Sequence, residues 1–178
     1  MKLITGLGNP GKQYEHTRHN AGFLAIDHFL KTHDAIVCAS KFNAQICEYH
    51  QDGEKVFLVK PQSFMNLSGE VVRELVHFYK LDPTTDLLVL HDEVDLPLGT
   101  VREGRDSGSA GHNGVQNIID ELGTKDFARV RIGIEVRESR DDLPTDAFVL
   151  QKFSPEELQG MEMVLPGVND LIEQFIKN

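Results

Sequence analysis

The polar residues of this sequence that could do chemistry follow glycine-rich turns or apolar strands. Residues 8–11 read Gly-Asn-Pro-Gly, a sharp bend after a short apolar strand that lets a ligand approach the backbone closely. His19 falls in the first turn of a predicted helix, so its imidazole faces the loop that carries Asn9. Asp92 stands just after the apolar run 87–90, at the carboxyl end of a predicted inner strand, where α/β sheets place their ligands.

This set of residues predicts hydrolysis by a water molecule under base catalysis. His19 is the candidate general base, and Asp92 would fix the tautomer of its ring and raise its basicity. Three amides follow strands in the same way and could hold a carbonyl group and the attacking water: Asn9, Asn66 and Asn113. Water activated by one histidine suits an ester better than an amide, because an alkoxide leaves more easily than an amine.

Two other chemistries compete with this one. Neither Ser63 nor Ser68 sits in the Gly-x-Ser-x-Gly turn of a nucleophilic serine, so water is the favoured attacking group. A metal-dependent hydrolase is an alternative, and its candidate ligands are His19, His91, Asp92, Glu93 and His112. The helical spacings H-E-x-x-H and H-x-x-E-H are absent, and a metal would leave the asparagines unexplained. We therefore expect neither a metal nor a cofactor; His112 is equally compatible with loop packing.

Strands and helices interleave along the chain, with one β-hairpin. Strands are expected over residues 3–7, 44–49, 54–59, 86–91, 100–102 and 129–136, and Asp52-Gly53 is the hairpin turn; an apolar segment lies at 35–38. Helices are expected over residues 17–33, 67–79, 115–122 and 154–165, the last stopped by Pro166-Gly167 before a second amphipathic segment at 168–175. Ser154, Pro155 and Glu157 form a helix-start signal. The pattern predicts an α/β fold: one domain over residues 1–178, a three-layer α/β/α sandwich around a twisted mixed sheet.

Charge and composition limit the partners. The net charge of −10 argues against indiscriminate binding to nucleic acid or to an anionic membrane. Residues 1–60 hold seven Lys/Arg against six Asp/Glu, whereas residues 61–178 hold eleven against twenty-two. A nucleic-acid partner would therefore have to meet a local basic patch on an acidic body.

The two cysteines and the apolar runs bear on the compartment. Cys38 and Cys47 lack the spacing of a metal site, and we expect both to be reduced thiols in the core. The longest aliphatic run covers only residues 87–90, far short of a membrane span, and no signal-peptide core follows Met1. A cytoplasmic protein is expected.

Five motifs in order carry a family resemblance. They are GLGNPG-x-x-Y-x-x-T-R-H-N-x-G at residues 6–22, K-P-x-x-F-M-N-x-S-G at 60–69, H-D-E-x-D-L-P-x-G at 91–99, G-H-N-G at 111–114 and R-x-R-I-G-I at 129–134. Together they resemble the bacterial-type peptidyl-tRNA hydrolases over nearly the whole chain. The resemblance implies a metal-free monomer that cuts the ester between a peptide and the 3′ end of tRNA, which returns the tRNA to translation.

The resemblance also implies a role for each motif residue. His19 resembles the catalytic base and Asp92 its partner. Asn9 resembles the residue that helps to distinguish an N-blocked peptidyl ester from a free aminoacyl ester. Substrate contacts near the peptide and the terminal nucleotide are implied for Tyr14, Phe64, Asn66 and Asn113.

Basic residues around the third glycine loop are implied for the tRNA body. The candidates are Arg102, Arg105 and Arg131, with Lys12, Lys41 and Arg129 as further ones. Gly104 stands where relatives often carry a basic residue, and Glu103 and Asp106 interrupt the arginines, so each arginine is equally compatible with an ordinary solvated charge. We expect the loop 106–111 to be mobile and to gate the site. A non-catalytic module that binds an RNA end on the same scaffold remains the rival from another class.

Overall fold

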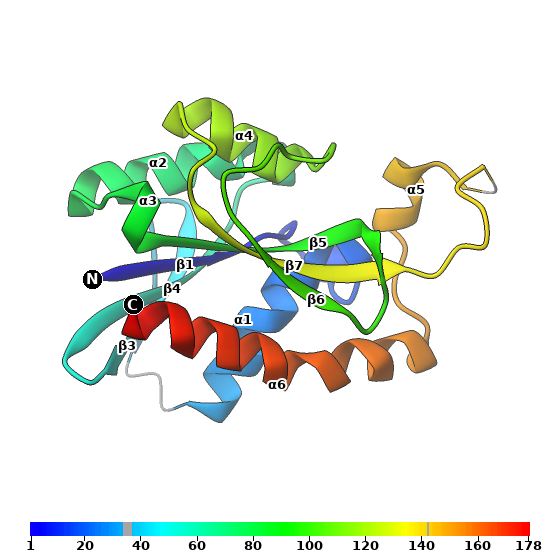
Figure 1. Cartoon of the computed structure of the whole chain (residues 1–178), viewed down its shortest axis with the longest axis horizontal. Coiled ribbons are helices and arrows are strands. Elements are labelled where there is room, and N and C mark those ends of the chain that lie inside the picture. The colour runs from blue at the N-terminus through cyan, green and yellow to red at the C-terminus, as the bar shows by residue number, and fades with distance from the viewer. Residues whose placement is uncertain (34–36, 142) are drawn as a thin grey trace.

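A mixed seven-stranded sheet forms the middle layer of the fold (Figure 1). The computed structural model describes residues 1–33, 37–141 and 143–178. The sheet order is β2 (Val37–Lys41), β3 (Ala44–Gln51), β4 (Glu54–Pro61), β1 (Lys2–Gly6), β5 (Leu87–Pro97), β7 (Ala128–Glu135) and β6 (Val101–Gly104). The central strands β4, β1, β5 and β7 are parallel. Toward the edges the pairing is antiparallel: β3 pairs with β4, β2 with β3, and β6 with β7. The predicted hairpin is confirmed as β3–β4.

Helices cover both faces of the sheet, as Figure 1 shows. α1 (Ala21–Thr32) and α6 (Pro155–Lys177) pack on one face, and α2 (Ser68–Tyr79) and α4 (Asn113–Leu122) on the other. Shorter turns are η1 (Lys12–Tyr14), η2 (Arg18–Asn20), η3 (Met65–Leu67), α3 (Pro83–Asp86) and α5 (Thr145–Val149). Each face has its own apolar core, so the predicted three-layer α/β/α arrangement is confirmed. None of the helices in the described ranges combines the length and apolar character that crossing a membrane requires.

A close approach of three backbones sets the position of the site. A Cβ atom at Gly22, in the first turn of α1, would collide with the backbone of Leu7 and of Leu90, so only glycine fits there. Leu7 N donates to Leu90 O at 2.9 Å, and Phe23 N donates to Leu7 O at 3.2 Å. The helix start is thereby held against the end of β1 and the middle of β5.

Strand β5 is longer than the sequence predicts. The prediction ended this strand at residue 91, but it continues to Pro97, with a register irregularity between Glu93 and Pro97. His91, Asp92 and Glu93 pair with Arg131–Gly133 of β7, so their backbone groups are satisfied inside the sheet. Their side chains therefore stand on a rigid strand. Residues 35 and 36 of the apolar segment 35–38 and residue 142 of the charged loop lie outside the described residues.

The prediction that the C-terminal helix stops at Pro166-Gly167 is wrong. α6 runs without interruption from Pro155 to Lys177, and it begins with the predicted capping box of Ser154 and Glu157. A single apolar stripe continues across the proline, and its buried members are Met161, Leu165, Val168, Ile172 and Ile176. Pro166 itself is exposed, so water can hydrate the carbonyl group that lacks a helical partner. The burial of the apolar stripe therefore outweighs the loss of one backbone hydrogen bond.

The prediction of two reduced core thiols is also wrong, because Cys38 and Cys47 form a disulfide. They face each other across the antiparallel β2–β3 pair, where opposed Cβ atoms lie close enough for the bond. Cys47 is buried, but Cys38 is exposed on the edge strand. The prediction missed this disulfide because the pairing depends on the register of the β2–β3 hairpin, which the spacing of the two cysteines in the sequence does not reveal.

Replacement of Pro166 by alanine tests the continuous helix. We expect Pro166→Ala to raise the free energy of unfolding by about 1–3 kcal/mol, because it restores a backbone donor in the middle of α6. Urea denaturation with an unchanged m-value measures this change. Pro155→Ala is the matched control. It increases the conformational freedom of the unfolded chain to the same extent, but no helical hydrogen bond is gained at the first helical position, so no stabilisation is expected. Equal effects of the two variants would contradict the assignment.

Candidate active site

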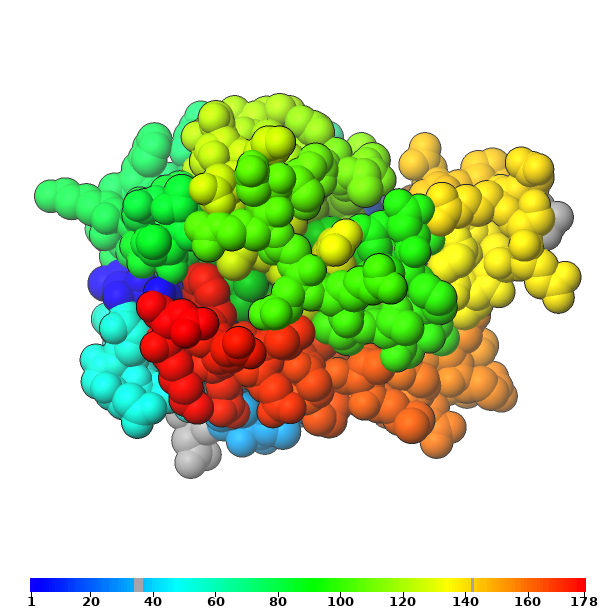
Figure 2. Space-filling view, in the orientation of Figure 1, coloured from blue at the N-terminus to red at the C-terminus, as the bar shows by residue number. Residues whose placement is uncertain are grey.

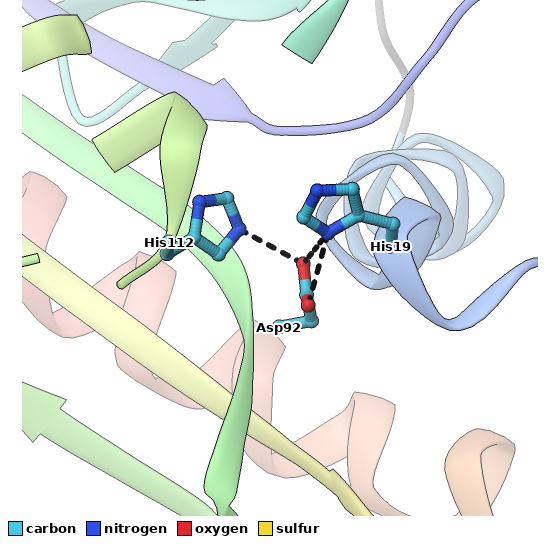
Figure 3. Close-up of side chains that lie close together, drawn as sticks. All are labelled: His19, Asp92 and His112. Carbon is cyan, nitrogen blue, oxygen red and sulfur yellow. Dashed lines mark hydrogen bonds and ion pairs between the residues drawn. The ribbon is translucent and has the colours of Figure 1, made fainter. Parts of the chain in front are cut away.

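Asp92 lies between two imidazole rings that come from different parts of the chain (Figure 3). His19 Nδ1 is 2.9 Å and 3.1 Å from the two carboxylate oxygens of Asp92, and His112 Nε2 is 2.9 Å from Oδ1. His19 comes from η2, Asp92 from β5, and His112 from the residue before α4. The carboxylate is almost fully buried, so it depends on these two donors in place of water.

The hydrogen bonds of His112 determine where its proton lies. His112 caps α4, and its Nδ1 accepts from the backbone N–H groups of Gly114 and Val115 at 3.1 Å and 3.2 Å. Since Nδ1 is an acceptor, the ring proton sits on Nε2 and is donated to Asp92. The same carboxylate accepts Nδ1–H of His19, which leaves His19 Nε2 as a lone pair facing the cleft that His19 lines.

The electrostatics of the pair suit a base and its carboxylate partner. Burial by itself raises the pKa of Asp92, but the charges and hydrogen bonds of His19 and His112 outweigh it and hold this pKa far below its ordinary value. Burial by itself lowers the pKa of His19, but the charge and hydrogen bond of Asp92, with the charge of Asp146, raise it above the ordinary 6.5. Asp92 is therefore an anion across the physiological range, and His19 is a stronger base than free imidazole.

His91 and Glu93 stand apart from this cluster. Burial, then the charge of His112, lowers the pKa of His91 to about 3, so its ring is neutral. The His91 Nδ1 atom lies 2.7 Å from the carbonyl oxygen of Asp92, and its ring packs edge-on to His112 with centroids 4.9 Å apart. Glu93 Oε1 accepts from the backbone N–H of Asp95. Neither side chain adds a ligand to the three residues that meet.

The donor set can be tested for a metal. One atom each from His19, Asp92 and His112 lie within 4.8 Å of one another, which is compact enough for an ion. A metal on His112 Nε2 would move the ring proton to Nδ1, where two backbone N–H groups already point. The hydrogen bonds around His112 therefore favour a proton on Nε2, and a protonated nitrogen cannot bind a metal ion.

Asn9 is held in one orientation by backbone groups. Its Oδ1 accepts from Met65 N–H at 2.8 Å, and its own backbone is clamped by the side chain of Asn20, which accepts from Asn9 N–H at 2.8 Å and donates to its carbonyl at 3.0 Å. The amide is thereby oriented with Nδ2 as the remaining donor, and no partner for it occurs within the part of the chain that the structure describes. Asn20, which the sequence placed beside His19 at the helix start, is the clamp for this loop.

A cleft of about 700 Å³ brings most of the predicted residues together. It is lined by the proposed catalytic pair and by all five predicted substrate contacts: Asn9, Tyr14, His19, Phe64, Asn66, Asp92 and Asn113. Phe64 is 56% exposed although aromatic, which leaves its face open to a ligand. Six further polar residues line the cleft, and no catalytic or substrate-binding role was predicted for them: Glu93, Asp95, His112, Arg140, Thr145 and Asp146.

Of these six, Glu93 and His112 stood only among the alternative metal ligands, and His112 also has a local signal in the sequence. It stands in G-H-N-G directly before a helix, where a side-chain acceptor caps the first turn. Arg140 and Asp146 lie in a charged stretch without periodicity. Arg140 reaches the cleft because it pairs with Asp95 at 2.7 Å and donates to the carbonyl of Val94, also at 2.7 Å. Such contacts cannot be inferred from spacing along the chain.

The predicted tRNA-binding arginines lie outside the cleft. Arg102 and Arg131 face each other across β6 and β7. Arg105 pairs with Asp126 and with the carbonyl of Thr84, so part of its guanidinium is already used within the protein. Arg129 is buried and donates to backbone carbonyls, which makes it a poor candidate for a surface contact. The other two candidates, Lys12 and Lys41, are exposed.

Known proteins share the sequence pattern and the fold of this chain. A family model described as peptidyl-tRNA hydrolase matches residues 3–178. The chain belongs to the peptidyl-tRNA hydrolase family. Proteins named peptidyl-tRNA hydrolase from Geotalea daltonii and Desulfitobacterium hafniense are 43% and 49% identical to it over 177 and 166 residues, which is 99% and 93% of this chain and 91% and 87% of theirs. A crystal structure of peptidyl-tRNA hydrolase from Acinetobacter baumannii matches with a TM-score of 0.90 at 30% identity, over 99% of this chain and 89% of that one.

The raised pKa of His19 can be measured directly. A titration of the histidine ring signals by NMR should give His19 a pKa above 6.5 and show no titration of His91 between pH 5 and 8. In Asp92→Asn the His19 pKa should fall below 6.5, because burial, which favours the neutral ring, is then opposed only by Asp146. An unchanged His19 pKa in that variant would refute the electrostatic role of Asp92.

Proposed function

We propose that this chain hydrolyses the ester bond between a peptide and the terminal ribose of tRNA and releases tRNA for reuse in translation. Its membership of the peptidyl-tRNA hydrolase family supports the substrate. One observation carries the chemistry: His19 donates Nδ1–H to the buried Asp92 and turns Nε2 toward the cleft. A module that only binds RNA ends would need no buried carboxylate behind that histidine.

In the proposed reaction, water attacks the ester carbonyl while His19 Nε2 takes its proton. Asp92 holds the ring and stabilises the imidazolium that forms, as its strongly lowered pKa allows. When the tetrahedral intermediate collapses, the bond between the carbonyl carbon and the ribose oxygen breaks. The proton on His19 passes to that oxygen, and the products are a free ribose hydroxyl and a peptide carboxylic acid, which releases its proton to solvent.

The other cleft residues are proposed to bind and orient the substrate. Asn9 Nδ2 donates to the carbonyl of the acyl group that blocks the amine of the esterified residue, an acceptor that a free aminoacyl ester lacks. Tyr14 and Phe64 contact the peptide or the terminal base, and Asn66 and Asn113 donate to the ester and the ribose. Arg102, Arg105 and Arg131 are proposed to meet the phosphates of the tRNA body.

We further propose that the protein acts as a single domain and a monomer, in the cytoplasm and without a metal. The hydrogen bonds that His112 Nδ1 accepts from Gly114 and Val115 support a site without a metal. The first assay is hydrolysis of an N-acetyl-aminoacyl-tRNA by the purified protein, with the unblocked aminoacyl-tRNA and an EDTA-treated sample in parallel. Cleavage of the blocked ester alone, unchanged by EDTA, is the expected result. Bound tRNA without cleavage would favour the binding module, and loss of activity with EDTA the metal-dependent hydrolase.

Substitution of His19 tests the base. We expect His19→Ala to lower kcat by about 10²–10⁴-fold with little change in tRNA affinity, because it removes the proton acceptor and leaves the binding contacts in place. His50→Ala, at an exposed position of β3 remote from the cleft, is the matched control and should keep the full rate. A near-normal rate for His19→Ala would overturn the mechanism.

Substitution of Asn9 tests the discrimination between esters. Asn9→Asp keeps an oxygen acceptor for Met65 N–H, so the fold should persist, but it replaces the Nδ2 donor by a negative oxygen. The ratio of kcat/KM for N-acetyl-aminoacyl-tRNA to that for aminoacyl-tRNA should fall at least about 10-fold, which corresponds to the free energy of one hydrogen bond. If the ratio stays at the wild-type value while both rates fall, Asn9 does not select the blocked ester.

A further inference from the structure

Arg129 of β7 is a buried arginine that contacts the loop between β6 and α4. The residue is 2% exposed, and its guanidinium carbon lies 4.5 Å from the centre of the buried Phe127 ring. Figure 2 shows the loop, in green to yellow-green, on the front surface of the molecule between α6 (red) and α4. The loop ends at His112, which donates to Asp92, so the way in which it is held bears on the site.

The guanidinium binds this loop through its backbone. It donates to the carbonyl of Ser107 at 2.6 Å, to that of Gly108 at 2.8 Å and to the Ser107 hydroxyl at 3.3 Å. A further bond of 3.3 Å reaches the carbonyl of Lys125, three residues before β7 begins. Hydrogen bonds from a charged donor are roughly twice as strong as neutral ones, and a guanidinium presents its donors in a fixed plane. Arg129 therefore ties the first half of the loop to the segment that precedes β7.

A tight turn connects this anchor to His112. The His112 N–H donates to the carbonyl of Ser109 at 2.9 Å, and the two residues between them, Ala110 and Gly111, have positive φ angles of 48° and 82°. Two successive positive φ angles are typical of a compact type I′ turn. The Ser109 hydroxyl also donates to the side chain of Gln116 in α4 at 2.9 Å. The position of the loop at the anchor is thus passed on to His112 through short, hydrogen-bonded steps.

The loop ends on two side chains of the cleft. His112 gives Asp92 its second hydrogen bond, and Asn113, the next residue, is a proposed substrate contact. The rings of His112 and His19 lie 4.9 Å apart between their centroids. The charges that act on His19 come from Asp92 of β5 and Asp146 of α5, both outside the loop. Of the titratable groups around the proposed base, His112 is the one whose position depends on the loop.

We propose that Arg129 is a positioning residue for the reaction: by fixing the loop it keeps His112 on Asp92 and Asn113 in the cleft. This inference rests on the proposed function, because it gives Arg129 a task at the same site. Arg129 does not line the cleft, so it acts through the loop and not on the substrate. A guanidinium suits the task, because it has five N–H donors and can hold several carbonyls at once.

Hydrogen exchange of the loop amides tests the anchor without reference to hydrolysis. In the wild type the His112 amide should be protected, because it donates to Ser109. Arg129→Met keeps a long side chain without donors and should speed the exchange of amides 107–113 at least about 10-fold, the effect of losing one hydrogen bond. Val76→Ala, which removes buried apolar groups in the last turn of α2, is the matched control for lowered stability and should leave these amides protected.

The pH profile of kcat/KM separates positioning from a loss of stability. When the loop loosens, His112 no longer shares the charge of Asp92, so His19 alone balances this charge and is protonated more easily. In Arg129→Met the acidic limb of kcat/KM for N-acetyl-aminoacyl-tRNA should move to higher pH by about 0.5–1, and the plateau should fall about 10-fold. Val76→Ala should keep the limb of the wild type, because unfolded protein lowers the rate without moving the limb.

A second variant guards against misfolding of Arg129→Met. Arg129→Lys keeps the charge but carries its three donors on one nitrogen, so both effects should be smaller and of the same sign. Unchanged loop protection in both variants, or a freely exchanging His112 amide in the wild type, would overturn the proposal. Faster exchange with an unmoved acidic limb would overturn the role of Arg129 in the reaction. Absence of hydrolysis in the wild type would contradict the proposed function, whereas the exchange rates would still decide on the anchor.

Discussion

The buried carboxylate of Asp92 is the constraint on which the rest of the site depends. A charged oxygen with almost no solvent contact must be matched by donors, and the fold provides one from His19 and one from His112. These donors come from opposite ends of the site, one before α1 and one before α4. Three segments far apart in sequence are thereby fixed around one group, and the position of each ring follows from it.

The sheet makes this arrangement rigid. Because β5 continues through residues 91–93 and pairs with β7, Asp92 projects from a central strand instead of from a loop. The contact of Gly22 with Leu7 and Leu90 brings the start of α1 against that strand. The capping bonds of His112 fix its proton on the nitrogen that faces Asp92. Backbone contacts thus fix the position of the proposed catalytic base. The surrounding loops carry the groups proposed to bind substrate.

The errors of prediction share one physical origin, which is that tertiary contacts outweigh local signals. Pro166 usually ends a helix, yet the apolar stripe buried on both sides of it carries α6 through. Cys38 and Cys47 became partners because the register of β2 and β3 opposes them. His112 looked ambiguous because its partner, Asp92, precedes it by 20 residues on another element. Each outcome depends on a tertiary contact that local sequence patterns do not identify.

The sequence by itself determined the family, the α/β fold and seven of the residues that line the cleft, because ordered motifs and hydrophobic periodicity are local properties of the chain. It also located the hairpin and the capping box at Ser154, whose partners lie within a few residues. Only the tertiary structure decided that two histidines share Asp92, which nitrogen of each ring carries the proton, and that Arg129 turns inward to the backbone carbonyls of Ser107, Gly108 and Lys125. These facts depend on contacts between residues far apart along the chain, and such contacts are set by the packing of the sheet and its two layers of helices.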